Sequence, residues 1–271
     1  MWLDVMQALI KPKILGAALL AFGSAANAYF PFQTDDTGTQ GTGGNQIEID
    51  YIYNESETVE FSQDGQSTTN SGTSNAFAFT YTLGVAPNID LFIGNSLQSS
   101  PAFGWQNIEI GAKWVFTGDQ EKNWSFALKP VVTFPVSSAS QNAGLGSAQT
   151  NGSLTLVGSY LADVYQVHIN LGYATNRLQD TPDTSPQRAS IWSASIAPVW
   201  VINEKWLLGL DFGIQTNAQY NTNYAGYAQI GVSYAPIPNL QLGLGIVTSS
   251  DLGDRDNTRS TSVTAGITYQ F

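Results

Sequence analysis

The chain has 271 residues, of which 42% are hydrophobic and only 11% are charged, and its formal net charge is −11. A soluble domain usually carries about 25% charged residues, so this composition argues against a soluble enzyme, and the absence of a basic patch disfavours nucleic acid as a partner. The sequence has no cysteine, which excludes disulfides and thiolate metal sites. A charge-poor chain rich in polar and aromatic residues is typical of a bacterial outer-membrane β-barrel.

The first 28 residues have the pattern of a secretory signal peptide. Lys11 and Lys13 precede a short apolar stretch, 14–22, and Ala26-Asn27-Ala28 matches a small-residue cleavage site. That stretch is shorter than the ~20 apolar residues of a membrane-spanning helix, and no other stretch of the chain is long enough. We expect cleavage after Ala28 and export to the bacterial outer membrane.

Residues 29–45 are rich in Gly and Thr and do not alternate like a strand. The adjacent carboxylates Asp35 and Asp36 have potential partners in Lys113 and Lys129, because an ion pair away from bulk water is stronger than an exposed one. One hypothesis is therefore that this segment lies in the barrel as a plug. The alternative is a loose periplasmic tail.

Residues 46–271 are predicted to form an all-β, transmembrane, antiparallel up-and-down β-barrel of about twelve strands. Each predicted strand has about 9–14 residues, enough to cross a bilayer at a tilt. Short connections alternate with longer ones, which indicates short periplasmic turns and longer outer loops. A longer hairpin within segment 55–73 would not be detected by this pattern. The predicted strands are 46–54, 74–86, 89–97, 104–116, 124–136, 152–162, 164–176, 189–202, 206–217, 223–235, 239–249 and 261–271.

The alternation also predicts which face of each strand meets lipid. In 206–217, for example, Trp206, Leu208 and Phe212 alternate with Asp211. A slip of one residue would turn such charges toward lipid, where a Lys at the midplane costs ~2–4 kcal/mol. Inward glycines would either keep the bore open or permit curvature and close packing. The predicted lumen-lining charged and titratable residues are Glu48, Asp50, Asp90, Glu109, Lys113, Lys129, His168 and Asp211.

The run from Pro31 to Thr39 (PFQTDDTGT), followed after several glycines by Gln46-Ile47-Glu48, resembles the opening of a known family. This is the outer-membrane transporter family associated with the MetA pathway of phenol degradation, which Gly111-Ala112-Lys113 also resembles. The resemblance implies a single-domain outer-membrane barrel with a role in moving aromatic or other hydrophobic compounds. It supplies no catalytic or binding residues.

The chain ends on a strictly alternating segment, 263–271, with an apolar face. Tyr269 and the terminal Phe271 resemble the insertion signal by which the barrel-insertion machinery recognises outer-membrane barrels. We therefore expect that machinery, outer-membrane lipid and lipopolysaccharide as partners.

Motifs for catalysis or metal binding are weak. His168 is the only histidine, and on a lumen face it would lie away from lipid substrates. Asp251, Asp254 and Asp256 lack the EF-hand spacing. We therefore expect no enzyme activity, no catalytic residue, no metal and no cofactor.

The sequence predicts an outer-membrane channel or transporter for small neutral or hydrophobic solutes, aromatic ones among them. One alternative is a structural barrel that sheathes a partner protein, and a more remote one is an outer-membrane lipid hydrolase. The identity of the small-molecule solute, the openness of the lumen and the oligomeric state are left open.

Overall fold

The computed structural model describes residues 30–61, 66–121, 123–180, 187–220, 222–253 and 257–271. The predicted signal peptide, 1–28, lies outside the described residues. The strands are β1 (Asn45–Phe61), β2 (Ser67–Ala86), β3 (Ile89–Ser100), β4 (Gly104–Trp105), β5 (Glu109–Gly118), β6 (Asn123–Thr133), β7 (Asn151–Leu161), β8 (Tyr165–Thr175), β9 (Ser190–Asn203), β10 (Trp206–Thr216), β11 (Tyr224–Ile237), β12 (Leu240–Leu252) and β13 (Asn257–Gln270). One short helix, α1 (Ser138–Asn142), lies between β6 and β7.

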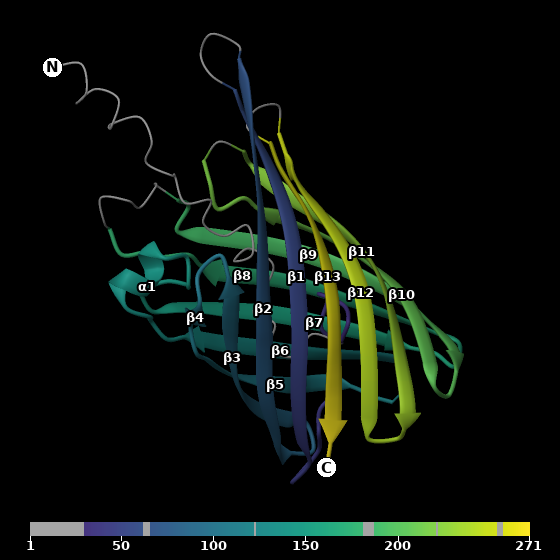
Figure 1. Ribbon diagram of the computed structural model, residues 1–271. Coiled ribbons are helices and arrows are strands. Elements are labelled where there is room, and N and C mark those ends of the chain that lie inside the picture. The colour runs from purple at the N-terminus through teal and green to yellow at the C-terminus, as the bar shows by residue number, and fades with distance from the viewer. Residues whose placement is uncertain (1–29, 62–65, 122, 181–186, 221, 254–256) are drawn as a thin grey trace, which may run out of the picture.

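The strands form a closed antiparallel barrel (Figure 1). Apart from β4, which pairs with β3 alone, each strand pairs with the next along the chain, so that β3 pairs with β5. In addition, β1 pairs with β13 over the register from Gln46↔Gln270 to Val59↔Asn257. This pairing closes the wall, which leaves no long sheet edge exposed. The predicted fold is confirmed, as a twelve-stranded barrel with the two-residue β4 added. Within the described residues, no helix is both long and apolar enough to span a membrane.

The predicted strand 104–116 is wrong in its first half. Its residues 104–105 form β4, which pairs only with Leu97 and Gln98 of β3, and β5 begins at Glu109. The chain leaves the ladder between β4 and β5 because the side chain of Asn107 bonds to backbone that lies beyond the end of the neighbouring strand β6. Its amide donates to the carbonyl oxygens of Phe134 (2.6 Å) and Ser147 (2.8 Å).

The first hairpin is longer than predicted. The β1–β2 ladder continues from Asn54↔Ser74 to Phe61↔Ser67, through most of the predicted loop 55–73. This extension rises above the rest of the wall in Figure 1. Its residues are mostly polar on both faces, so no apolar alternation marks it in the sequence.

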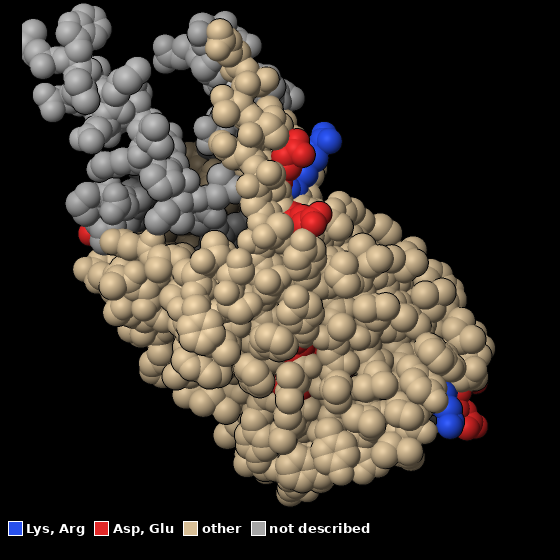
Figure 2. Space-filling view, in the orientation of Figure 1, with Lys and Arg blue, Asp and Glu red and all other residues tan. Residues whose placement is uncertain are grey.

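Burial follows the predicted faces of the strands. On β10, Trp206, Phe212 and Ile214 are more than 40% exposed, whereas Asp211 is fully buried. Figure 2 shows a wide surface with charged side chains mainly at its two ends, apart from one small acidic area in the middle. An apolar outer band with polar residues inside is the pattern of a barrel in a lipid bilayer.

Aromatic side chains gather at the end of the barrel that holds the short turns and the C-terminus, which we call the short-turn end. Trp124 lies 5.2 Å from Tyr160, and Tyr160 lies 5.8 Å from Tyr165, measured between ring centroids. Trp206 stacks on Tyr234 at 4.4 Å. Indole and phenol rings favour the membrane–water interface, so these rings mark one boundary of the apolar band.

Candidate functional site

Residues 30–44, which we call the N-terminal segment, lie inside the barrel before β1 begins. Their backbone and side chains bond to residues from many strands around the wall, among them Asp90 of β3, Lys113 of β5, Asp211 of β10 and Gln229 of β11. A segment that reaches strands so far apart around the wall crosses the lumen. Of these wall residues, Asp90 lies beside the short turn between β2 and β3, whereas Asp211 lies in the middle of β10, so the segment extends from the short-turn end to the middle of the wall.

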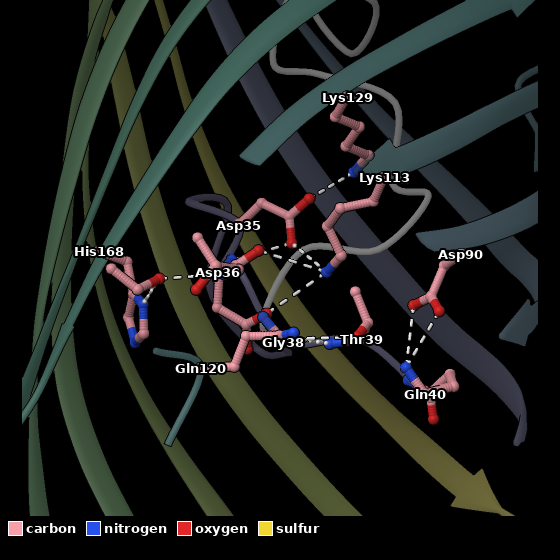
Figure 3. Close-up of polar contacts among 12 residues, drawn as sticks. Asp35, Asp36, Gly38, Thr39, Gln40, Asp90, Lys113, Gln120, Lys129 and His168 are labelled. Atoms are coloured by element: carbon pink, nitrogen blue, oxygen red, sulfur yellow. Dashed lines mark hydrogen bonds and ion pairs between the residues drawn. The ribbon is translucent and has the colours of Figure 1, made fainter. Parts of the chain in front are cut away.

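A pair of lysines holds the middle of the segment (Figure 3). Asp35 Oδ2 lies 2.7 Å from Lys129 Nζ, and Asp35 Oδ1 lies 3.5 Å from Lys113 Nζ. All three side chains are at most 7% exposed. Removing one partner of a buried ion pair typically costs about 3–5 kcal/mol, because the other charge is left uncompensated.

Asp36 adds a second carboxylate to Lys113, at 3.4 Å. Burial is the largest single effect and would raise the pKa of the Asp36 carboxyl, but the positive charge and hydrogen bond of Lys113, His168 and the N–H of Gly38 together outweigh it. The pKa of Asp36 is therefore below its usual range, and the group is charged at neutral pH. With its amide turned to match its neighbours, Asn170 accepts from the N–H of Asp35 (2.7 Å) and donates to its carbonyl oxygen (3.1 Å).

A single carboxylate on the opposite wall anchors the start of the segment. Asp211 Oδ2 accepts the N–H groups of Gln33 and Thr34, both at 2.7 Å. Its Oδ1 accepts the hydroxyls of Thr34 (2.7 Å) and Tyr227 (2.8 Å). The four hydrogen bonds to this buried carboxylate are charge-assisted and therefore strong, and three of them hold the segment, two through its backbone and one through the Thr34 hydroxyl.

The end of the segment is held near the short turns. The N–H of Gln40 donates to both oxygens of Asp90 (3.0 and 3.1 Å), and Thr39 Oγ1 donates to Gln120 (2.9 Å). The N–H of Thr37 donates to Ser159 Oγ at 3.0 Å. Anchors at Asp211, the lysine pair and Asp90 therefore fix the segment at three heights along its path.

Glycines of the wall make room for the aromatic start of the segment. A Cβ placed on Gly231 would lie 2.7 Å from Pro31 Cγ and 2.9 Å from Phe32 Cε1, closer than real Cβ contacts. A Cβ on Gly243 would collide with the ring of Phe30. Of the two interpretations of the inward glycines, close packing holds at these positions, because backbone and ring are in direct contact.

His168 has a serine neighbour that the sequence did not indicate. Its Nδ1 lies 2.9 Å from Ser159 Oγ, and its Nε2 lies 3.3 Å from Gln166 Oε1. A hydrolase needs a serine that substrate can reach, whereas Ser159 is fully buried and His168 is 1% exposed. Here the pair serves to hold Thr37.

Three further predicted lumen residues lie on the strands β1 and β5: Glu48, Asp50 and Glu109. Glu48 and Asp50 are buried on β1, and each keeps one carboxylate oxygen without a hydrogen-bond partner among the described residues. Glu109 is half-buried at the start of β5 and accepts from Thr133 Oγ1 at 3.4 Å. Tyr269 and Phe271 stack at the C-terminus with a centroid distance of 5.8 Å. Among the described residues, no group of three or more His, Cys, Asp or Glu side chains is placed to hold a metal.

A family model described as "Putative MetA-pathway of phenol degradation" matches residues 84–271, more than two thirds of the chain. The chain belongs to this family. The predicted resemblance is thereby confirmed, although its opening residues, 31–48, precede the region that the family model matches. A comparison with curated protein sequences gives no match.

Several solved structures share the fold of this family member. An outer-membrane channel from Pseudomonas putida F1 aligns with a TM-score of 0.65 at 11% identity, over 87% of this chain and 98% of that one. The porin NanC aligns with a TM-score of 0.58 at 11% identity, over 82% and 98% of the two chains. CymD, described as a monoaromatic hydrocarbon channel, aligns with a TM-score of 0.50 at 10% identity, over 86% and 90%. At such identities the likeness concerns the fold alone.

Proposed function

We propose that this chain is a bacterial outer-membrane channel that passes small neutral or hydrophobic solutes, aromatic compounds among them. The observation that carries this proposal is the contact between the rings of the N-terminal segment and the glycines of the wall. Phe32, 2% exposed, lies against Gly231 and Gly209 inside a largely polar lumen. The wall thus offers flat backbone surfaces to apolar rings, and CymD supports a use for such a fold in aromatic transport.

The N-terminal segment acts in this proposal as a plug that narrows the short-turn half of the lumen. Its docking depends on a few buried charged groups, Asp211, Lys113 and Lys129, and not on covalent attachment along its length. The short-turn end faces the periplasm, and the chain reaches the outer membrane by a signal peptide cleaved after Ala28. Outer-membrane lipid and lipopolysaccharide surround the apolar band, and the barrel-insertion machinery assembles it.

Planar-bilayer recordings test both parts of this proposal. Protein lacking residues 30–44 should show a higher single-channel conductance than the full chain, because the segment no longer obstructs the lumen. Lys205→Gln, in an exposed short turn, is the control and should conduct like the unchanged protein. Equal conductance with and without the segment would reject the plug.

Solute entry is measured in the same recordings as interruption of the ionic current. Benzamide, a neutral aromatic solute, should interrupt the current of the shortened protein at lower concentration than glucose does. If glucose interrupts the current and benzamide does not, the proposed preference for aromatic solutes is wrong.

A further inference from the structure

The carboxylate of Asp35 occupies a site that a solute could use. Its two oxygens face two different ammonium groups, Lys129 Nζ at 2.7 Å and Lys113 Nζ at 3.5 Å (Figure 3). The two lysines come from the neighbouring strands β5 and β6, so the barrel wall alone sets their spacing. The wall therefore holds a two-point receptor for a carboxylate, and the segment supplies its present occupant.

We propose that Lys113 and Lys129 form a binding site for the carboxylate of an aromatic or otherwise hydrophobic solute, which competes with Asp35 and favours release of the N-terminal segment. This inference rests on the proposed function, and it names a class of solute beyond the neutral ones.

The charge balance of the lumen supports this competition. When the segment leaves, Asp35 and Asp36 leave with it, and the three ion pairs of the described residues are all lost. The two lysine side chains, which are at most 7% exposed while the segment is docked, then remain on the wall without these carboxylates. A solute carboxylate restores the lost pairing, so it binds the undocked state better than the docked one and shifts the population toward release.

The surroundings of the lysines favour an apolar body behind the carboxylate. The ring of Phe92 on β3 lies 5.3 Å from Lys129 Nζ and packs against Val131. Gly111, between them on β5, has no side chain and would otherwise collide with the Phe92 ring. An ammonium beside an aromatic face suits a ligand that combines negative charge with an apolar ring.

A solute carboxylate must compete with the carboxylate of Asp35, which the chain tethers close to the two lysines, and this competition limits how strongly the solute binds. Short flexible tethers give effective concentrations in the millimolar range, so a free carboxylate should act only weakly on the unchanged protein. Asp35→Ala removes the tethered competitor and leaves both lysines in place. Asp36 faces Lys113 alone, at 3.4 Å, so it competes for half of the site.

The test compares benzoate with benzamide, which has the same ring and no charge, in single-channel recordings. Benzoate should interrupt the current of Asp35→Ala at a concentration at least about tenfold lower than in the unchanged protein, while benzamide, which gains only from the looser segment, should show a much smaller change. Asp163→Ala, in an exposed short turn between β7 and β8, removes a carboxyl elsewhere and should behave like the unchanged protein. Adding Lys129→Gln to Asp35→Ala should abolish the gain for benzoate.

Two results would overturn the site. One is an equal benzoate response in Asp35→Ala and Asp163→Ala, and the other is a gain for benzamide as large as that for benzoate. If Asp35→Ala does not assemble, refolding yield in benzoate against benzamide gives the same comparison, and a yield independent of the anion counts against the site. Interruption by benzamide without any gain for benzoate removes this inference and leaves the proposed channel intact.

Discussion

Gly231→Ala should loosen the N-terminal segment without harming the barrel. The three atoms nearest to the added Cβ all belong to the segment: Pro31 Cγ at 2.7 Å and Phe32 Cε1 and Cδ1 at 2.9 and 3.4 Å. Carbon atoms pack best at about 3.5–4.0 Å, so Pro31 must move away by roughly 0.8–1.3 Å at this point.

Overpacking of this kind costs about 1–3 kcal/mol, which corresponds to a docking equilibrium weakened about 5- to 150-fold. In single-channel recordings, the full-length Gly231→Ala variant should spend more time at the higher conductance that the protein lacking residues 30–44 shows. In that shortened protein the same substitution should change nothing, since its contact atoms are gone.

Gly152→Ala is the matched control, because the nearest atom to its Cβ is the carbonyl oxygen of Val131 at 3.3 Å and no atom of the segment is near. It should leave the conductance unchanged. The reasoning fails if Gly231→Ala conducts like Gly152→Ala, or if it alters the shortened protein as much as the full chain.

Three further substitutions and one titration test other contacts. Lys113→Gln removes one of the two ammonium groups that face buried Asp35 and the one at 3.4 Å from partly exposed Asp36, at a cost of up to about 3–5 kcal/mol, and should raise the conductance toward that of the shortened protein; an unchanged conductance would contradict this. Phe212→Lys places a charge on the lipid-facing side of β10 and should lower the free energy of unfolding in lipid by ~2–4 kcal/mol, whereas Phe212→Leu should cost far less. Phe271→Ala, which keeps the backbone hydrogen bonds to Asn45, should slow assembly by the insertion machinery and leave the unfolding temperature of assembled barrels unchanged. Docking lowers the pKa of Asp36, so its ionic stabilisation is complete above the ordinary carboxyl pKa of about 3.9 and is lost as the pH falls through the lower docked value; conductance should therefore rise only below about pH 4, and a rise near pH 6 would point to another group.

The barrel wall was predictable because a lipid-facing strand imposes a strict period of two. Phe212 and Asp211 were assigned to opposite faces on that ground, and their exposures agree. The β1–β2 extension was missed because the pattern disappears where neither face meets lipid. The break before β5 was missed because it depends on Asn107 bonding to residues 27 and 40 positions away.

The site was predictable only in its charges. The ion pairs of the structure were suggested by two features of the sequence. Asp35 and Asp36 are adjacent carboxylates in a segment without a strand pattern, and Lys113 and Lys129 lie on the predicted inward face of their strands. The role of Asp211 was not foreseeable, because two of its four hydrogen-bond donors are backbone N–H groups, which every residue but proline carries. Ser159 was missed as a partner of His168 because that contact depends on the register between β7 and β8.

The reach of the N-terminal segment has a consequence for assembly. Its hydrogen bonds join residues 178 and 198 positions apart, from Gln33 to Asp211 and from Pro31 to Gln229. The residues synthesised first therefore find their partners only after strands near the end of the chain are in place. A barrel closed in a shifted register would present Asp211 at the wrong height for Gln33 and leave the segment without its anchors. Docking of the segment therefore requires that the wall has closed in the correct register.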